Sequence, residues 1–203
     1  MNHLAHLFLA DPHPLSLVGN LAGDFVKGAL GDRFDPAIRD GIAQHRRIDA
    51  FTDTHPAAAA FRRVIAREHG HYAGVIADMF FDHFLASRFD ELAGEPLETF
   101  LARTFAAIDP HEASLPGMLR TLYPRIRDER WLQSYRHVDA IRDALRNMSF
   151  RFSRRPRLET SAHLLIDARE ELERHFDAFF PEVVGFARGA VPRFLGVPRS
   201  SSE

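Results

Sequence analysis

The stretch YAGVIADMFFDHFLASRFD, residues 72–90, is the most informative part of the sequence for the fold. Its apolar side chains lie at nearly every angle around a helix, not on one face only. Because a helix of this kind is stable only when other elements cover it, we expect residues 72–90 to form a buried helix. Three polar side chains, Asp78, Asp82 and His83, interrupt this apolar surface.

The sequence on both sides of this stretch is also helical. Asp35-Pro36 has the pattern of an N-cap followed by a first-turn proline, and predicts a helix that runs to about Thr54. Further helices are predicted over 57–69, from Pro96 to 108, and over 112–123, 128–148, 158–179 and 182–191, with an arginine-rich connection at 149–157. Convincing strand and hairpin signals are absent. The sequence therefore predicts an all-α fold.

We expect the helices to form one domain. The 203 residues hold no repeat and no linker long enough to divide two domains. The prediction is a single-domain helical bundle of about eight helices over residues 1–198, with a disordered tail at 199–203.

Composition excludes several classes of protein. The chain has no cysteine, which excludes a disulfide scaffold, a zinc ribbon and a thiol nucleophile. A net charge of −2 argues against a general nucleic-acid binder. No apolar run reaches the roughly 18 residues of a membrane span, and no basic residue precedes the first apolar stretch, as a secretory signal would require. We therefore expect a cytoplasmic protein with neither a nucleic-acid nor a membrane partner.

The helix that follows Asp35 carries ionisable groups on its apolar face. At about 100° per residue, Ile38 and Ile42 define the inner face, and His45 and Asp49 continue the same stripe. Two ionisable groups on an inward face are costly unless they are paired or bound to a metal. A structural His–Asp hydrogen bond and a metal site both satisfy this pattern.

Weaker candidates lie near that stripe and near the start of the sequence. Asp24 follows a run of small residues, although on its own this pattern is explained better by a surface position. His6 lies between apolar neighbours, one turn from His3. Arg46 and Arg47 point away from the apolar face, where they are either solvated or able to reach an anion.

The polar residues of the stretch at 72–90 are harder to explain by packing. Asp78 and Asp82 lie one turn apart in an otherwise apolar helix, and His83 is adjacent. A desolvated pair of carboxylates resists ionisation unless a cation lies between them. With His45 and Asp49, these residues favour a divalent cation such as Mn²⁺, Mg²⁺ or Fe²⁺, and metal-assisted hydrolysis.

Segments along most of the chain match one known family in the same order. They are Asn2-His3-Leu4-Ala5-His6-Leu7, Gly19-Asn20, Asp24-Phe25-Val26, His45-Arg46-Arg47-Ile48-Asp49, Thr52-Asp53, Asp78, Asp82-His83-Phe84, Trp131 with Tyr135-Arg136, and Ser153-Arg154-Arg155-Pro156-Arg157-Leu158. In these segments the sequence resembles the acyl carrier protein phosphodiesterases, also called acyl carrier protein hydrolyases.

The resemblance implies an all-helical, HD-domain-like fold, a distorted relative of the HD-domain metal phosphohydrolases. It also implies Mn²⁺-dependent removal of the 4′-phosphopantetheine arm from holo acyl carrier protein. On this basis the expected metal ligands are Asp24, His45, Asp82 and His83, and the expected further catalytic residues are Asp78, Asp49 and His6. Ordinary HD sites carry a His-Asp pair, whereas this chain has the reverse order in Asp82-His83.

Two other functions remain open at this point. The same residues suit an HD-like metal phosphohydrolase that acts on nucleotides or other small phosphoesters. A non-enzymatic helical binding module, in which the His–Asp pairs are structural, also fits.

Substrate contacts are expected from arginines. Arg46 or Arg47 would neutralise charge on the phosphate. Residues 142–157 hold six arginines and one acid, which makes this segment a local positive surface. Since acyl carrier proteins are acidic, we expect Arg154 and Arg155 to bind the holo carrier as a protein substrate.

Overall fold

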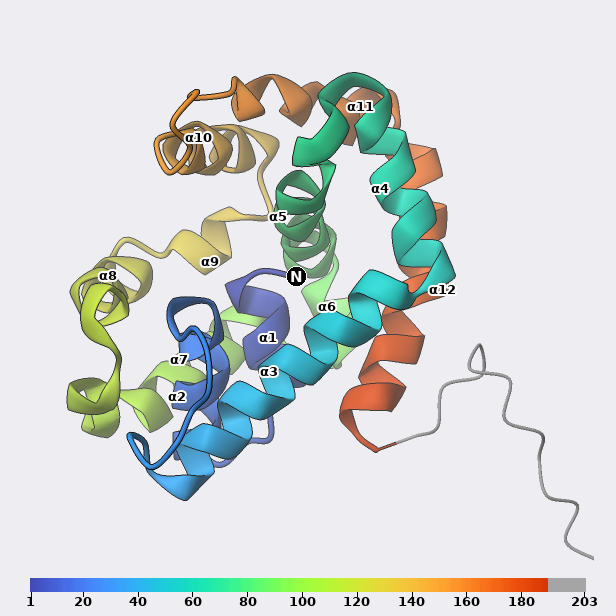
Figure 1. Cartoon of the computed structure of the whole chain (residues 1–203). Helices are drawn as coiled ribbons and strands as arrows, with labels where there is room; N and C mark the ends of the chain where they lie inside the picture. Colours follow the sequence, from blue (N-terminus) through green and yellow to red (C-terminus); the bar gives the residue numbers. More distant parts are fainter. Residues whose placement is uncertain (190–203) are drawn as a thin grey trace, which may run out of the picture.

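A computed structural model describes residues 1–189, and every regular element within them is helical (Figure 1). The α-helices are α1 (His3–Leu9), α2 (Pro14–Ala22), α3 (Pro36–Thr54), α4 (Pro56–His69), α5 (Ala73–Ser87), α6 (Phe89–Ala93), α7 (Leu97–Ile108), α8 (Gly117–Asp128), α9 (Trp131–Ser134), α10 (Val138–Ser149), α11 (Leu164–Asp167) and α12 (Arg169–Ala187). Short 3₁₀ segments cover Gly23–Phe25, Gly70–Tyr72, Asp109–Ser114 and Leu158–His163. The predicted all-α class is confirmed.

The central helix is α5, which lies between α1, α4, α10 and α12 (Figure 1). Its phenylalanines Phe80, Phe81 and Phe84 are all buried, as the apolar character of this stretch predicts. The helix ends at Ser87, earlier than predicted, and α6 follows it directly. The buried apolar residues form one continuous cluster, which extends from α1 to α12.

Several predicted helices have different bounds in the structure. The helix predicted over 158–179 is divided into the 3₁₀ segment Leu158–His163, the short α11 and α12, and the helix predicted over 112–123 is α8, which begins at Gly117. The helix predicted over 128–148 is divided into α9 and α10, because the backbone is extended at His137; α9 itself begins after Arg130, whose φ of 55° is left-handed. The short helix predicted over 182–191 is, as far as Ala187, the end of α12. Apolar spacing does not reveal these breaks, because the same side chains face the core whether the helix is broken or continuous. The predicted tail at 199–203, and the predicted domain end at 198, lie outside the described residues.

Helices α2 and α3 touch through their backbones. A Cβ atom added at Gly19 would lie 2.3 Å from the carbonyl oxygen of Ile38, and one added at Gly41 would lie 2.4 Å from that of Ser16. Only glycine allows this approach, which brings α2 against the first half of α3 (Figure 1). The residues of α3 that follow Gly41 therefore face the residues that follow Gly19.

Within residues 1–189, no helix is both long enough and apolar enough to cross a membrane.

Candidate metal centre

His45 on α3 is held in one orientation by the end of α2. The ring is buried, and its Nδ1 lies 2.9 Å from the carbonyl oxygen of Asn20. Because a carbonyl oxygen can only accept, Nδ1 carries a hydrogen and donates it. Nε2 then faces two carboxylates, 3.1 Å from Asp49 Oδ2 and 3.5 Å from Asp24 Oδ1. The backbone contact thus aims the free nitrogen of the ring at a pair of acids.

The space for this ring is provided by Gly23. A Cβ atom at Gly23 would lie 2.2 Å from Cγ of His45, so any side chain there would displace the imidazole. Gly19 and Gly23 are one turn apart in the chain, as are Gly41 and His45. The backbone contact between the helices is thus repeated one turn later as a contact between a glycine and an imidazole.

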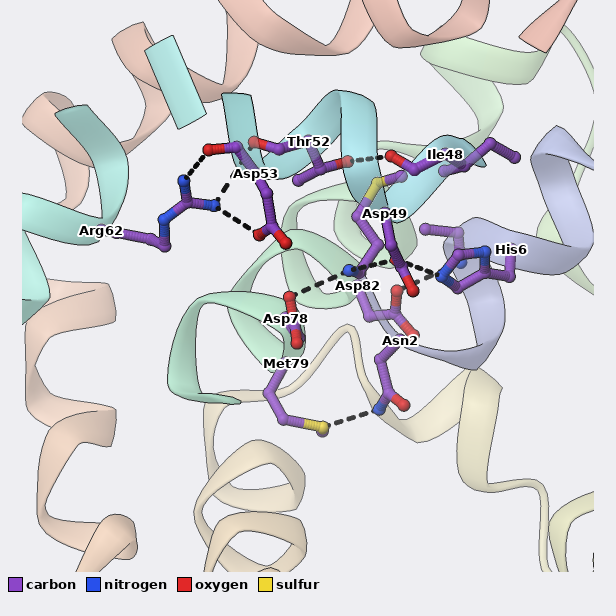
Figure 2. Close-up of polar contacts among 12 residues, drawn as sticks. Asn2, His6, Ile48, Asp49, Thr52, Asp53, Arg62, Asp78, Met79 and Asp82 are labelled. Carbon is purple, nitrogen blue, oxygen red and sulfur yellow. Dashed lines mark hydrogen bonds and ion pairs between the residues drawn. The ribbon is translucent and has the colours of Figure 1, made fainter. Parts of the chain in front are cut away.

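His6 on α1 approaches the same carboxylate from the other side. Its Nε2 lies 3.1 Å from Oδ1 of Asp49 (Figure 2). The two imidazoles of His6 and His45 are stacked, with ring centroids 3.6 Å apart. Ligand atoms of His6, His45 and Asp49 all lie within 4.8 Å of one another, which is the separation expected of groups that share one ion.

The two imidazoles have opposite protonation states. Burial opposes the charged form of His45, but hydrogen bonds to Asp24 and Asp49 outweigh it and raise the pKa of His45 to about 9. Burial lowers the pKa of His6 to about 4, so this ring is neutral at pH 7. Burial also opposes ionisation of Asp49, yet hydrogen bonds from both histidines hold its pKa well below the usual range. The proton on His45 lies where a metal ion would lie, so a metal ion would replace it.

Asp78 on α5 lies on the wall of the same site. Its Oδ1 accepts a hydrogen bond of 2.9 Å from the Met1 amino group, which is also 3.6 Å from Asp49 Oδ1 (Figure 2). Burial opposes the charge on this amine, but the two carboxylates outweigh it and raise its pKa to about 10. The Met1 ammonium group therefore bridges the carboxylates of Asp78 and Asp49.

Asp82 on α5 holds α1 in place. It is fully buried, and its two carboxylate oxygens accept hydrogen bonds from the backbone N–H groups of Leu4 (2.8 Å) and Ala5 (3.1 Å). These N–H groups belong to the first turn of α1, where the helix itself provides no acceptor. Asp82, although it belongs to α5, thus caps the N-terminus of α1. This contact fixes the position of His6, which lies on α1.

The pKa of Asp82 gives its stabilising role a pH dependence. Burial raises this pKa from 3.8 to about 7, against the effect of the two backbone hydrogen bonds. Between pH 4 and pH 7 the folded state therefore binds more protons at Asp82 than the unfolded state. Since stability falls with pH wherever the folded state binds more protons, the contribution of Asp82 to stability decreases across this window.

We expect Asp82→Ala to lower the free energy of unfolding by roughly 2–4 kcal/mol, because it leaves two buried N–H groups without an acceptor. Urea unfolding at pH 5 and at pH 7 measures the effect. The difference in the free energy of unfolding between wild type and variant should be larger at pH 5. Asp82→Asn, which keeps one acceptor oxygen and cannot ionise, is the matched control and should cost less. If this difference instead grew as the pH rises, the ionised form of Asp82 would be the stabilising one, contrary to this expectation.

His83 points away from this group of residues. Its Nδ1 lies 2.8 Å from the carbonyl oxygen of Tyr135, and the ring is buried. Adjacent residues of a helix point about 100° apart. When Asp82 faces α1, His83 consequently faces the segment that contains α9. Among the predicted ligands, the structure brings Asp24 and His45 together, and does not bring Asp82 or His83 to them.

The arginines predicted to contact the phosphate, Arg46 and Arg47, and the carrier, Arg154 and Arg155, do not line the candidate metal centre. Arg46 donates a hydrogen bond of 2.9 Å to the carbonyl oxygen of Val26. Arg47, Arg154 and Arg155 are exposed, and Arg155 lies over the ring of Phe150 at 5.3 Å.

A cavity of about 700 Å³ opens beside the metal centre. Its wall includes the acids Asp24, Asp49, Asp53 and Asp78 and the cations Lys27 and Arg151. Asp53 is partly neutralised by Arg62, whose Nη1 lies 3.5 Å from Oδ1 of Asp53 (Figure 2). Sequence reasoning missed the position of Arg151, because no local pattern connects it to residues more than 70 positions earlier.

Comparison with known proteins gives one consistent result. The chain matches the family described as acyl carrier protein phosphodiesterase over residues 1–183. A protein of that name from Serratia proteamaculans is 37% identical over 194 residues, which cover 93% of this chain and 98% of the relative. Its counterpart from Yersinia enterocolitica is 34% identical over 189 residues, with the same coverage. No solved structure gives a significant match, so the HD-domain likeness stays a prediction.

Proposed function

Because this chain belongs to the acyl carrier protein phosphodiesterase family, we propose that it hydrolyses the phosphodiester bond between 4′-phosphopantetheine and the serine of holo acyl carrier protein. The products are apo carrier protein and free 4′-phosphopantetheine. The observation that carries this proposal is the convergence of His6, His45 and Asp49 beside an open cavity. Such a group of imidazoles and a carboxylate suits metal-assisted hydrolysis of phosphoesters.

The proposed cofactor is Mn²⁺, held by His6, His45 and Asp49, with Asp24 as a further carboxylate. Two imidazoles and carboxylates form a mixed set of donors, which suits Mn²⁺ or Fe²⁺ better than Mg²⁺. When bound, such an ion polarises the phosphoryl group and lowers the pKa of a coordinated water. Asp82 and His83 are left out of the set, since both are engaged with backbone groups elsewhere.

The chain's own residues prepare the site for this ion. Asn20 holds His45 in the tautomer that leaves Nε2 free for a metal. Asp49 lies 3.1 Å from Nε2 of each imidazole, with one carboxylate oxygen toward each ring, and so helps to set their separation. Asp78 also lines the cavity, where its carboxylate can accept a hydrogen bond from water or substrate.

We further propose that the exposed Arg154 and Arg155 bind the acidic carrier, in the cytoplasm. Both follow α10 in a segment with few acids, so their charge is available to a partner.

Incubation of the purified protein with holo carrier and Mn²⁺ tests the function. We expect conversion to apo carrier, seen as loss of the arm in an intact-protein mass spectrum, and no conversion after chelation. A parallel panel of nucleotides tests the alternative phosphohydrolase. Hydrolysis of nucleotides without conversion of holo carrier would overturn the proposal.

A further inference from the structure

A second cavity, of about 480 Å³, lies next to the one beside the metal centre. Its wall comes mainly from α8, α9 and α10, and includes Leu122, Trp131, Tyr135 and Ala144. The volume lies within the range of roughly 300–1,000 Å³ that is typical of small-molecule sites. The residues Asn2, His3, Met148 and Arg151 line both cavities, so the two spaces adjoin at these four residues.

Arg151 stands out among the arginines near this junction. Arg125, Arg142 and Arg146 each form an ion pair with a nearby acid. Arg151 is exposed, and its guanidinium forms neither a hydrogen bond nor an ion pair with any of residues 1–189. An unpaired planar guanidinium beside a group of metal-ligand type is well suited to a phosphate.

The wall of the second cavity combines apolar and polar side chains. Leu122, Trp131 and Met148 provide apolar surface, whereas Ser134 and Asn147 provide hydrogen-bonding groups. A ligand that fits such a wall has short hydrocarbon segments separated by amides or hydroxyls. Pantetheine has this structure, with a dimethyl-substituted carbon, a hydroxyl group, two amides and short methylene segments.

We propose that the second cavity binds the pantetheine part of the phosphopantetheine arm, while Arg151 binds its phosphate at the junction of the cavities. This inference rests on the proposed function and deepens it, because it explains how the enzyme recognises the arm separately from the carrier. The phosphodiester would then lie between Arg151 and the metal centre.

Binding of free 4′-phosphopantetheine, measured by calorimetry with Mn²⁺ present, tests the proposal. Ala144→Phe and Ala140→Phe each add a ring to the cavity wall, and both positions are only half-buried, so the core is not disturbed. In each variant we expect the affinity for phosphopantetheine to fall by a factor at least ten times larger than the affinity for inorganic phosphate. Arg151→Gln should lower the affinity for both ligands.

The matched control is Ala187→Phe, which adds the same ring to a separate cavity of about 430 Å³. It should bind phosphopantetheine as the wild type does. Trp131 is the only tryptophan in the chain, so its fluorescence reports on the cavity without any substitution. The fluorescence should change with phosphopantetheine and remain constant with inorganic phosphate.

The outcomes separate this inference from the proposed function. If the wild type converts holo carrier but both cavity variants bind phosphopantetheine normally, the cavity assignment is wrong and the function stands. If the wild type binds no phosphopantetheine, the inference fails whatever the activity. If it binds phosphopantetheine in this cavity but does not convert holo carrier, the cavity assignment stands and the function fails.

Discussion

Substitution of His45 by alanine is expected to lower kcat/KM for holo carrier by about a thousandfold or more, and to remove Mn²⁺ binding. His45 is the residue through which Asn20, Asp24 and Asp49 are connected. Without its imidazole, the proposed metal centre would lose one of its two nitrogen donors. The variant should remain folded, because Asp24 and Asp49, which contact the ring, line the open cavity, so that water can fill the space that the ring leaves. Isothermal titration with Mn²⁺ and the holo carrier assay together measure the effect.

His83→Ala is the matched control for this substitution. Both histidines are buried, and each places Nδ1 against a backbone carbonyl oxygen. Since His83 does not face Asp49, its loss should lower stability by roughly 1–3 kcal/mol but leave Mn²⁺ binding in place. Loss of the metal from both variants would favour the ligand set predicted from the sequence over the one that the structure brings together.

Gly23→Ala adds only one methyl group, yet it is expected to cause a similarly large loss of turnover and of Mn²⁺ binding. The backbone at Gly23 is helical, so alanine is not strained there. Its Cβ atom would lie 2.2 Å from the ring of His45, so the imidazole must rotate away from Asp49. We expect turnover and Mn²⁺ affinity each to fall at least a hundredfold.

The control is Gly74→Ala, within α5, where an added Cβ atom meets no atom within 4 Å. This substitution should leave turnover unchanged and stabilise the protein slightly, since alanine is a better helix former than glycine. Circular dichroism and thermal unfolding of both variants check that the fold is retained. Normal Mn²⁺ affinity in a folded Gly23→Ala protein would contradict the assigned position of His45.

Periodicity predicts the parts of the site that lie on one helix. His45 and Asp49 are one turn apart, so their shared direction is a local property of α3. The partners of this pair come from α1 and from the end of α2, and no local pattern indicates which loops bring His6 and Asp24 to them. The long-range contacts therefore could be expected only from the family resemblance.

Asp82 shows why an unusual residue does not identify its own role. An acid in an apolar helix signals a special environment, and the sequence alone suggests a metal ligand. The structure shows that the two N–H groups of Leu4 and Ala5 satisfy this carboxylate. A capping carboxylate and a metal-binding carboxylate look the same in the sequence, because they differ only in the element that they face. The same limit applies to Arg151, whose lack of an acidic partner is visible only in the fold.

The cap that Asp82 places on α1 also sets an order of events during protein synthesis. Helix α1 has seven residues, fewer than the roughly 12–15 that an isolated helix needs for stability in water. Its stabilising acceptor is translated more than 70 residues later. Until α5 has left the ribosome, the segment that carries His6 has no fixed conformation. The group of His6, His45 and Asp49 is thus expected to assemble only after α5 has been synthesised, although all three of its residues precede α5 in the chain.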